Sequence, residues 1–178
     1  MAAPTRRGSL RRSMAALGVL LLAITPVLLI GSAQPIRARR AMVVSQDDIA
    51  SRVGVAIMRD GGNAMDAAVA TALALAVTYP TAGNIGGGGF LIYRPVEGPP
   101  VAYDFRETAP GGSFPAMFVR DGEYDPVIHH NSHLAVGVPG TVAGLHLAWS
   151  EHGVLPWRRL VEPAVALAGD GFAMSDVL

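Results

Sequence analysis

The chain has 178 residues, enough for about one domain, and 51% of them are hydrophobic while 16% are charged, a balance typical of a globular protein with a buried core. It contains no cysteine and no lysine, which excludes disulfides, thiolate metal sites, a cysteine nucleophile, lysine Schiff bases and a P-loop lysine from this segment. The formal net charge is zero, but beyond residue 33 ten arginines face 14 acidic residues, a balance that gives no support for nucleic-acid binding.

The first 33 residues resemble a secretory leader. Four arginines precede Met14, residues 14–31 are uncharged and largely apolar, and the small residues Ser32 and Ala33 follow. This order of basic, apolar and small segments predicts a signal peptide cleaved after Ala33. We therefore expect residues 34–40 to be a linker, residues 41–178 to form the body, and the protein to be exported, either periplasmic or secreted.

The alternative for the leader is an uncleaved N-terminal membrane anchor. The apolar run is close to the lower length limit of a membrane-spanning helix, and three arginines beyond it blur the charge asymmetry that orients such helices. The protein is expected to contact a membrane only in this case.

The first elements of the body are predicted from apolar spacing and capping residues. Residues 42–44 are a short apolar run that predicts a strand. Asp47 or Asp48 then offers an N-cap to a helix whose apolar residues recur at 49, 53 and 57. A glycine pair ends this helix, and Asn63 can cap the next one. Residues 64–77 are alanine-rich on nearly every face, which predicts a buried helix.

The remaining elements alternate between strands and helices. Strands are predicted at residues 90–93 and 101–105, joined by a turn rich in proline and glycine, and a helix is predicted at residues 141–151. Pro156 and Pro163 each suit the first turn of a helix, which predicts a short helix and then a longer one to about Ala168. The mixture indicates an α+β or layered α/β fold.

The sequence GNIGGGGF at residues 83–90 is the most unusual stretch. A dinucleotide-binding glycine turn follows a strand and opens a helix, whereas these glycines follow a predicted helix and enter a strand. We therefore favour a structural role, in which the glycines permit close backbone packing or a positive φ.

Two further motifs carry polar side chains. In DFRETAP, residues 104–110, Arg106 is flanked by two acidic residues, so it can form a surface ion pair or present a planar fork to a carboxylate ligand. His129, His130 and His133 lie close together, but proline and Asn-Ser nearby predict a loop without helical ligand spacing, so we expect no metal site. The residues alone reveal no reaction.

Several motifs in order and register do point to a family. The run from residue 41 to 90, then DFRETAP, then SHLAVGVPGTVAGL at residues 132–145 and LVEPAVALAGDGF at residues 160–172, resembles the start of the γ-glutamyltranspeptidases. The resemblance covers about residues 41–178, and it implies an N-terminal-nucleophile hydrolase with a four-layer αββα core, here incomplete. It also implies a precursor that cleaves itself into a large and a small subunit and needs no cofactor.

The implied reaction transfers or hydrolyses the γ-glutamyl group of glutathione or a related amide, through a γ-glutamyl-enzyme whose acceptor is an amino acid or water. By this resemblance Arg106 binds the α-carboxylate of the substrate, and it is the one functional residue that carries over. The nucleophilic threonine is expected in the small subunit, outside this chain. None of the threonines in the body of the chain matches it: Thr71, Thr78, Thr81, Thr108 and Thr141.

We therefore expect a partial large subunit with no catalytic residue of its own, inactive when alone. Two alternatives stay open at this point. One is a related exported acylase of the same superfamily, such as a cephalosporin acylase or a polyglutamate-cleaving enzyme. The other is a truncated remnant without catalytic activity.

Overall fold

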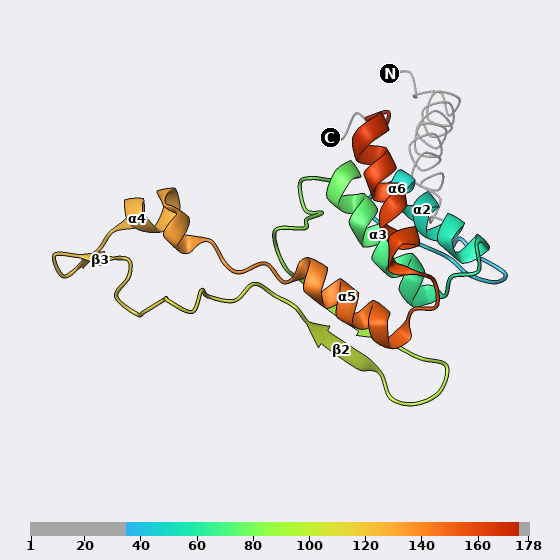
Figure 1. Cartoon of the computed structure of the whole chain (residues 1–178), viewed down its shortest axis with the longest axis horizontal. Helices are drawn as coiled ribbons and strands as arrows, with labels where there is room; N and C mark the ends of the chain where they lie inside the picture. The colour runs from blue at the N-terminus through green and yellow to red at the C-terminus, as the bar shows by residue number, and fades with distance from the viewer. Residues whose placement is uncertain (1–34, 175–178) are drawn as a thin grey trace, which may run out of the picture. The chain divides into compact units, whose positions relative to one another are not determined.

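The computed structural model describes residues 35–174, and the chain divides into two units, residues 1–41 and 42–178 (Figure 1). The predicted signal peptide lies outside the described residues. Residues 35–41 are exposed and carry no helix or strand. Among the described helices, none is both long and apolar enough to cross a membrane.

The first two helices begin at the caps that the sequence predicts. Helix α2 (Asp48–Arg59) is capped by Asp47, whose carboxylate accepts the N–H of Ala50 at 2.9 Å. Helix α3 (Ala64–Thr78) begins with a capping box, in which Asn63 and Asp66 each accept a backbone N–H from the other residue. These reciprocal bonds satisfy N–H groups that a helix leaves unpaired at its first turn.

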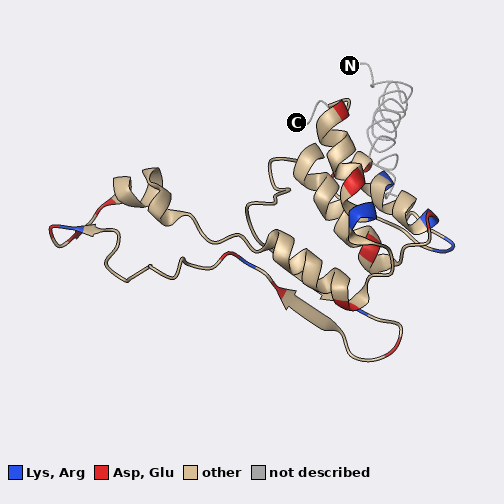
Figure 2. Ribbon diagram, in the orientation of Figure 1, with Lys and Arg blue, Asp and Glu red and all other residues tan. Residues whose placement is uncertain are grey.

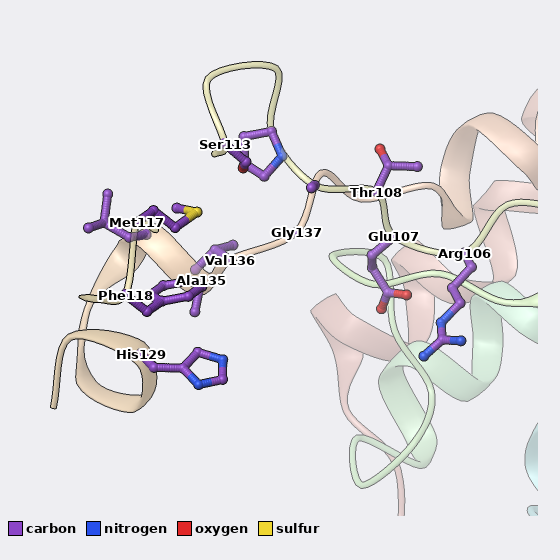
Figure 3. Close-up of a pocket in the computed structure, with 13 residues that line it drawn as sticks. Arg106, Glu107, Thr108, Ser113, Met117, Phe118, His129, Ala135, Val136 and Gly137 are labelled. Carbon is purple, nitrogen blue, oxygen red and sulfur yellow. The ribbon is translucent and has the colours of Figure 1, made fainter. Parts of the chain in front are cut away.

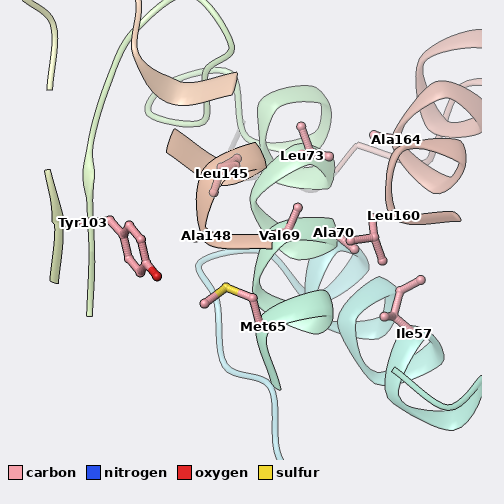
Figure 4. Close-up of a cluster of buried hydrophobic side chains, with 10 residues drawn as sticks. All are labelled: Ile57, Met65, Val69, Ala70, Leu73, Tyr103, Leu145, Ala148, Leu160 and Ala164. Carbon is pink, nitrogen blue, oxygen red and sulfur yellow. The ribbon is translucent and has the colours of Figure 1, made fainter. Parts of the chain in front are cut away.

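Helix α3 is the centre of the larger unit, and α2, α5 (Thr141–His152) and α6 (Trp157–Asp170) all pack against it (Figure 1). The predicted buried helix is thus confirmed. Its core contacts come from alanine and medium-sized apolar side chains, which let the helices approach closely. Figure 4 shows the cluster, which contains Ile57, Met65, Val69, Ala70, Leu73, Tyr103, Leu145, Ala148, Leu160 and Ala164.

The two predicted strands form an antiparallel hairpin beside these helices. Strand β1 (Phe90–Tyr93) pairs with β2 (Val101–Asp104), with Leu91 opposite Tyr103. Tyr103 points into the core and its hydroxyl donates to Glu151 of α5 at 2.5 Å. Burial and this carboxylate together raise the pKa of Tyr103 to about 12.

Between β2 and α5 the chain makes a long excursion over residues 106–139. It contains the two-residue strands β3 (Val119–Arg120) and β4 (Glu123–Tyr124), helix α4 (Pro126–Asn131) and the 3₁₀ turn η1 (His133–Ala135). The excursion closes where Thr108 and Val138 exchange backbone hydrogen bonds of 2.8 and 3.4 Å.

Two predicted elements are wrong. Residues 42–44 form no strand, because within residues 35–174 no segment pairs with them. The two helices predicted at Pro156 and Pro163 are one continuous helix, with Pro156 as its N-cap and Pro163 inside it. Leu160 and Ala164 on either side of Pro163 are buried in the core, and this burial offsets the hydrogen bond that proline cannot donate.

Charged side chains are sparse around the hairpin and its neighbouring helix. Helix α5 carries Glu151 as its single acidic residue and has no arginine (Figure 2). The charged residues near the hairpin include four at or just beyond the ends of β1 and β2: Arg94, Asp104, Arg106 and Glu107. The strand ends are therefore where the polar chemistry near the hairpin lies.

Candidate functional site

Arg106 lies two residues beyond the end of β2, where the backbone is held by local hydrogen bonds. The N–H of Phe105 donates to the carbonyl of Gly89 at 3.1 Å, which extends the hairpin pairing by one residue. The N–H of Arg106 donates to the side chain of Asp104, also at 3.1 Å. The main chain at residues 105 and 106 is thus held by one hydrogen bond to the neighbouring chain segment at Gly89 and one to the side chain of Asp104.

Two glycines from distant parts of the sequence pack directly against residues 105–107, which we call the strand exit. A Cβ atom on Gly88 would lie 2.6 Å from the nitrogen of Glu107 and 2.7 Å from the Cα of Arg106. A Cβ atom on Gly140 would lie 2.0 Å from the carbonyl oxygen of Phe105. Real Cβ contacts are longer than this, so both positions require glycine for the strand exit to lie where it does.

The side chain of Arg106 is exposed although its backbone is fixed. Within residues 35–174 its guanidinium forms no ion pair with a carboxylate, although acidic residues stand two before and one after it in the sequence. The surface ion pair that the sequence left open therefore does not form among these residues. A guanidinium in this state is available to a carboxylate ligand, which it can bind through two parallel hydrogen bonds.

An open cavity of about 530 Å³ lies beside the strand exit. Figure 3 shows Arg106 and Glu107 on one side of this cavity and Phe118 and His129 on the other. The excursion supplies the rest of the lining: Thr108, Ala109, Pro110, Ser113, Met117, Leu134, Ala135, Val136 and Gly137. One wall thus carries charge, and the other is mainly apolar and aromatic.

The lining residues on the excursion were not predicted from the sequence. Phe118 and His129 contact each other with ring centroids 4.5 Å apart, although Phe118 lies in the turn before β3 and His129 lies on α4. Their place beside Arg106 depends on the excursion returning to Thr108 through Val138. No local spacing signals a contact of this kind, so only the folded chain reveals these residues.

The histidine cluster has a different local structure from the predicted loop. His129 and His130 lie on the short helix α4, and His133 begins the turn η1. Asp125 explains the helix, because its carboxylate accepts the N–H groups of residues 127 and 128 while Pro126 occupies the first turn. In the described part of the chain, no three His, Cys, Asp or Glu residues are arranged to hold a metal ion.

The glycine loop, residues 83–89, connects α3 to β1 and has the structural role predicted for it. Gly88 makes a close approach to the strand exit, and a Cβ on Gly83 would lie 2.1 Å from the carbonyl oxygen of Leu75. None of the glycines in the loop has a positive φ. Close packing, rather than an unusual backbone conformation, therefore accounts for the loop.

Comparison with known proteins places these features in a family. The family model described as Gamma-glutamyltranspeptidase matches residues 50–178. The Glutathione hydrolase proenzyme of Escherichia coli (strain K12) is 51% identical over 145 residues, which are 81% of this chain and 25% of that protein. The chain therefore spans about a quarter of the length of this curated relative.

Solved structures agree with the sequence matches. The crystal structure of Helicobacter pylori gamma-glutamyltranspeptidase aligns with a TM-score of 0.76 at 42% identity, covering 80% of this chain and 42% of that one. A cephalosporin acylase from Bacillus halodurans aligns with a TM-score of 0.61 at 26% identity, covering 83% and 28%.

These matches confirm the predicted N-terminal-nucleophile hydrolase fold class for this helix and strand arrangement. They also agree with the order of motifs read from the sequence, because the family match spans the glycine loop, the strand exit, α5 and α6. The chain belongs to the γ-glutamyltranspeptidase family.

Proposed function

We propose that the full-length protein containing this chain transfers or hydrolyses the γ-glutamyl group of glutathione and related γ-glutamyl amides. The proposal rests on one observation beyond family membership. Arg106 has a backbone held by hydrogen bonds and glycine contacts, and an exposed guanidinium without a carboxylate partner among the described residues, beside an open cavity. A fixed backbone and an unpaired, exposed guanidinium are the features expected of an arginine that binds an anionic ligand.

The role of Arg106 in this proposal is to position the substrate. A bidentate contact with the α-carboxylate fixes one end of the γ-glutamyl group, and this places the γ-carbonyl for attack. The attacking threonine, its amine base and the oxyanion donors belong to a small subunit outside this chain, as family membership implies. The acyl-enzyme is then released to water or to an acceptor amino acid.

Substitution of Arg106 by lysine tests this role in the full-length, processed protein. Lysine keeps the positive charge but loses the planar two-pronged donor, so kcat/KM on a γ-glutamyl amide should fall roughly ten- to a hundredfold. Self-cleavage should persist because it uses no γ-glutamyl substrate. The matched control is Arg94→Lys, since Arg94 is exposed and its guanidinium donates to the turn carbonyl of Gly98.

A second substrate makes the test specific for the carboxylate. The 4-aminobutanoyl amide is the same group without its α-carboxylate, and wild type should strongly prefer the γ-glutamyl amide over it. Arg106→Lys should lose most of this preference, whereas Arg94→Lys should keep it. An equal preference in Arg106→Lys and wild type would show that Arg106 does not read the carboxylate.

A related acylase is the second candidate, favoured by the likeness to the cephalosporin acylase structure. The same pair of substrates distinguishes an acylase from a γ-glutamyl transferase or hydrolase. An acylase that acts on another acyl group is not expected to prefer the γ-glutamyl amide. A full-length protein that neither cleaves itself nor turns over either substrate would instead support the remnant without activity.

We further propose that the protein is exported and that its leader is removed after Ala33. The support is the order of four arginines, an uncharged apolar run and small residues at the start of the sequence. Mass spectrometry of the protein recovered outside the cytoplasm should find Gln34 as the first residue. A cytoplasmic protein that keeps residues 1–33 would contradict the proposal, and a membrane-bound one would support the anchor.

A further inference from the structure

Asn84 connects two segments that pack against the strand exit. Its side-chain oxygen accepts two hydrogen bonds, one from the N–H of Gly87 at 3.0 Å and one from the hydroxyl of Thr141 at 2.6 Å. Thr141 is the first residue of α5 and stands 57 residues further along the chain. One amide oxygen therefore ties the glycine loop to the beginning of α5.

The backbone strengthens the same connection from the other side of Gly87. Its carbonyl accepts the N–H groups of Gly140 and Thr141 at 2.8 and 3.0 Å. Helix α5 has no side-chain cap, so this carbonyl satisfies two of the N–H groups that the helix leaves unpaired at its first turn. Both polar groups of the Gly87 backbone are thus fixed, the N–H by Asn84 and the C=O by α5.

Gly88 and Gly140, which pack against the backbone of the strand exit, lie directly beside this junction. Gly88 follows Gly87 and contacts the backbone of residues 106 and 107, and Gly140 precedes Thr141 and contacts the carbonyl of Phe105. The strand exit is therefore held between two surfaces whose separation is set by the bonds from Asn84 and by those to the Gly87 carbonyl. A shift of the glycine loop away from α5 would leave the backbone of Arg106 without one of these two supports.

We propose that Asn84 is a positioning residue, which together with Thr141 holds the glycine loop and α5 together so that Arg106 presents its guanidinium at a fixed place. The inference rests on the proposed function, because it assumes that Arg106 binds a substrate carboxylate. Asn84 then keeps Arg106 in the position that this binding requires. Asn84 itself does not contact substrate in this proposal. It acts through Gly87, Gly88 and the strand exit.

Two pairs of variants test this in the full-length, processed protein. Asn84→Leu is close in volume but removes the acceptor oxygen, whereas Asn84→Asp keeps an acceptor for both hydrogen bonds. Thr141→Val removes the hydroxyl donor, whereas Thr141→Ser keeps it. The readout is the ratio of kcat/KM for the γ-glutamyl amide to that for the 4-aminobutanoyl amide, with KM and kcat determined separately for each.

The matched control is Thr71→Val, because Thr71 is as deeply buried as Thr141 and its hydroxyl donates to a helix carbonyl away from the strand exit. Asn84→Leu and Thr141→Val should lower the substrate preference by roughly three- to tenfold, mainly through KM of the γ-glutamyl amide. The acceptor-keeping and hydroxyl-keeping variants should recover most of the preference. Thr71→Val should lower the stability of the protein but leave the substrate preference unchanged.

The outcomes separate this inference from the proposed function. If wild type discriminates between the two substrates and both Asn84→Leu and Thr141→Val discriminate equally well, Asn84 has a structural role only and the inference is wrong. If wild type itself shows no preference, the carboxylate-binding role of Arg106 fails and the inference fails with it. Should Asn84→Leu not fold, the comparison of Thr141→Val with Thr141→Ser and Thr71→Val decides the question.

Discussion

Asp66 is a charged residue with no exposed surface, and all of its bonding is to backbone N–H groups. It closes the capping box with Asn63 at 3.0 Å and also accepts the N–H groups of Val154 and Leu155, at 3.2 and 3.4 Å, in the turn between α5 and α6. A single carboxylate thus fixes the start of α3 and the connection between two other helices. A buried carboxylate bonded in this way stabilises the fold because each donor it satisfies would otherwise be unpaired.

Replacing Asp66 by alanine should lower the free energy of unfolding by about 3 kcal/mol, since it leaves the N–H groups of Asn63, Val154 and Leu155 without this acceptor. Asp48→Ala is the control, because Asp48 is exposed and its pairing with Arg52 is worth about 0–1 kcal/mol. Denaturant unfolding of the two variants in the full-length protein measures the difference. Equal losses in the two variants would mean that the Asp66 bonds contribute little.

Capping was the part of the structure that single residues could predict. Asn63 was identified as a cap from the sequence, and Asp47 as one of two candidates with Asp48, because a cap acts on N–H groups two or three residues away. The second role of Asp66 was not predicted, since its partners in the α5–α6 turn stand 88 and 89 residues away. Arg106 was identified only through the resemblance of its motif, because its own neighbours in sequence equally suggested an ion pair.

At the scale of elements, the predictions failed where an element depends on a distant partner. The apolar run at residues 42–44 has strand composition, but a strand needs a neighbour to pair with, and the described residues supply none. Pro163 has the character of a helix start, but the buried residues around it keep α6 continuous. In α6, packing in the core prevails over the preference of proline for a helix start. At residues 42–44, the lack of a pairing partner prevails over the strand preference of the apolar residues.

The glycine loop allows a matched test of close packing. Gly88 and Gly86 stand two residues apart, and neither has a positive φ. A Cβ on Gly88 would meet backbone atoms at 2.6 Å, whereas a Cβ on Gly86 would have nothing within 4 Å. Gly88→Ala should therefore destabilise the protein by about 1–3 kcal/mol and reduce turnover of the γ-glutamyl amide.

Gly86→Ala should stay within about 0.5 kcal/mol of wild type, because the added methyl group enters open space. Thermal or denaturant unfolding of both variants, together with kcat/KM, measures the contrast. If both substitutions are tolerated equally, the loop moves freely enough to accommodate a side chain, and the close approach to the strand exit is not required.

At the scale of the whole molecule, Tyr103 gives the stability a dependence on alkaline pH. Its side chain packs between the hairpin and α5, where the hydroxyl donates to Glu151, and its neighbours include Tyr93 and His152. Burial first, and then the hydrogen bond and charge of Glu151, raise the pKa of Tyr103 to about 12 in the folded protein. The unfolded chain releases this proton near pH 10.

Between these two pH values the folded protein binds more protons than the unfolded chain, so the stability contribution is complete below about pH 10 and is lost as the pH rises towards 12. Tyr103→Phe should remove this part of the pH dependence, whereas Tyr124→Phe, on the exposed β4 strand, should retain it. Unfolding free energies measured from about pH 9 to about pH 11.5 test the sign. A wild-type slope identical to that of Tyr103→Phe would contradict the assignment.

The closure of the excursion at Thr108 and Val138 has a consequence for how this molecule can diverge. The ends of the intervening loop meet beside the strand exit, so the entropic cost of closing it grows only with the logarithm of its length, about 0.6 kcal/mol for each doubling. Insertions or deletions between these two residues would therefore reshape the far wall of the cavity at small cost while the arginine wall stays in place. Under the proposed function, such changes in length would alter which groups attached to the γ-glutamyl unit the cavity accepts, while Arg106 continues to bind the α-carboxylate.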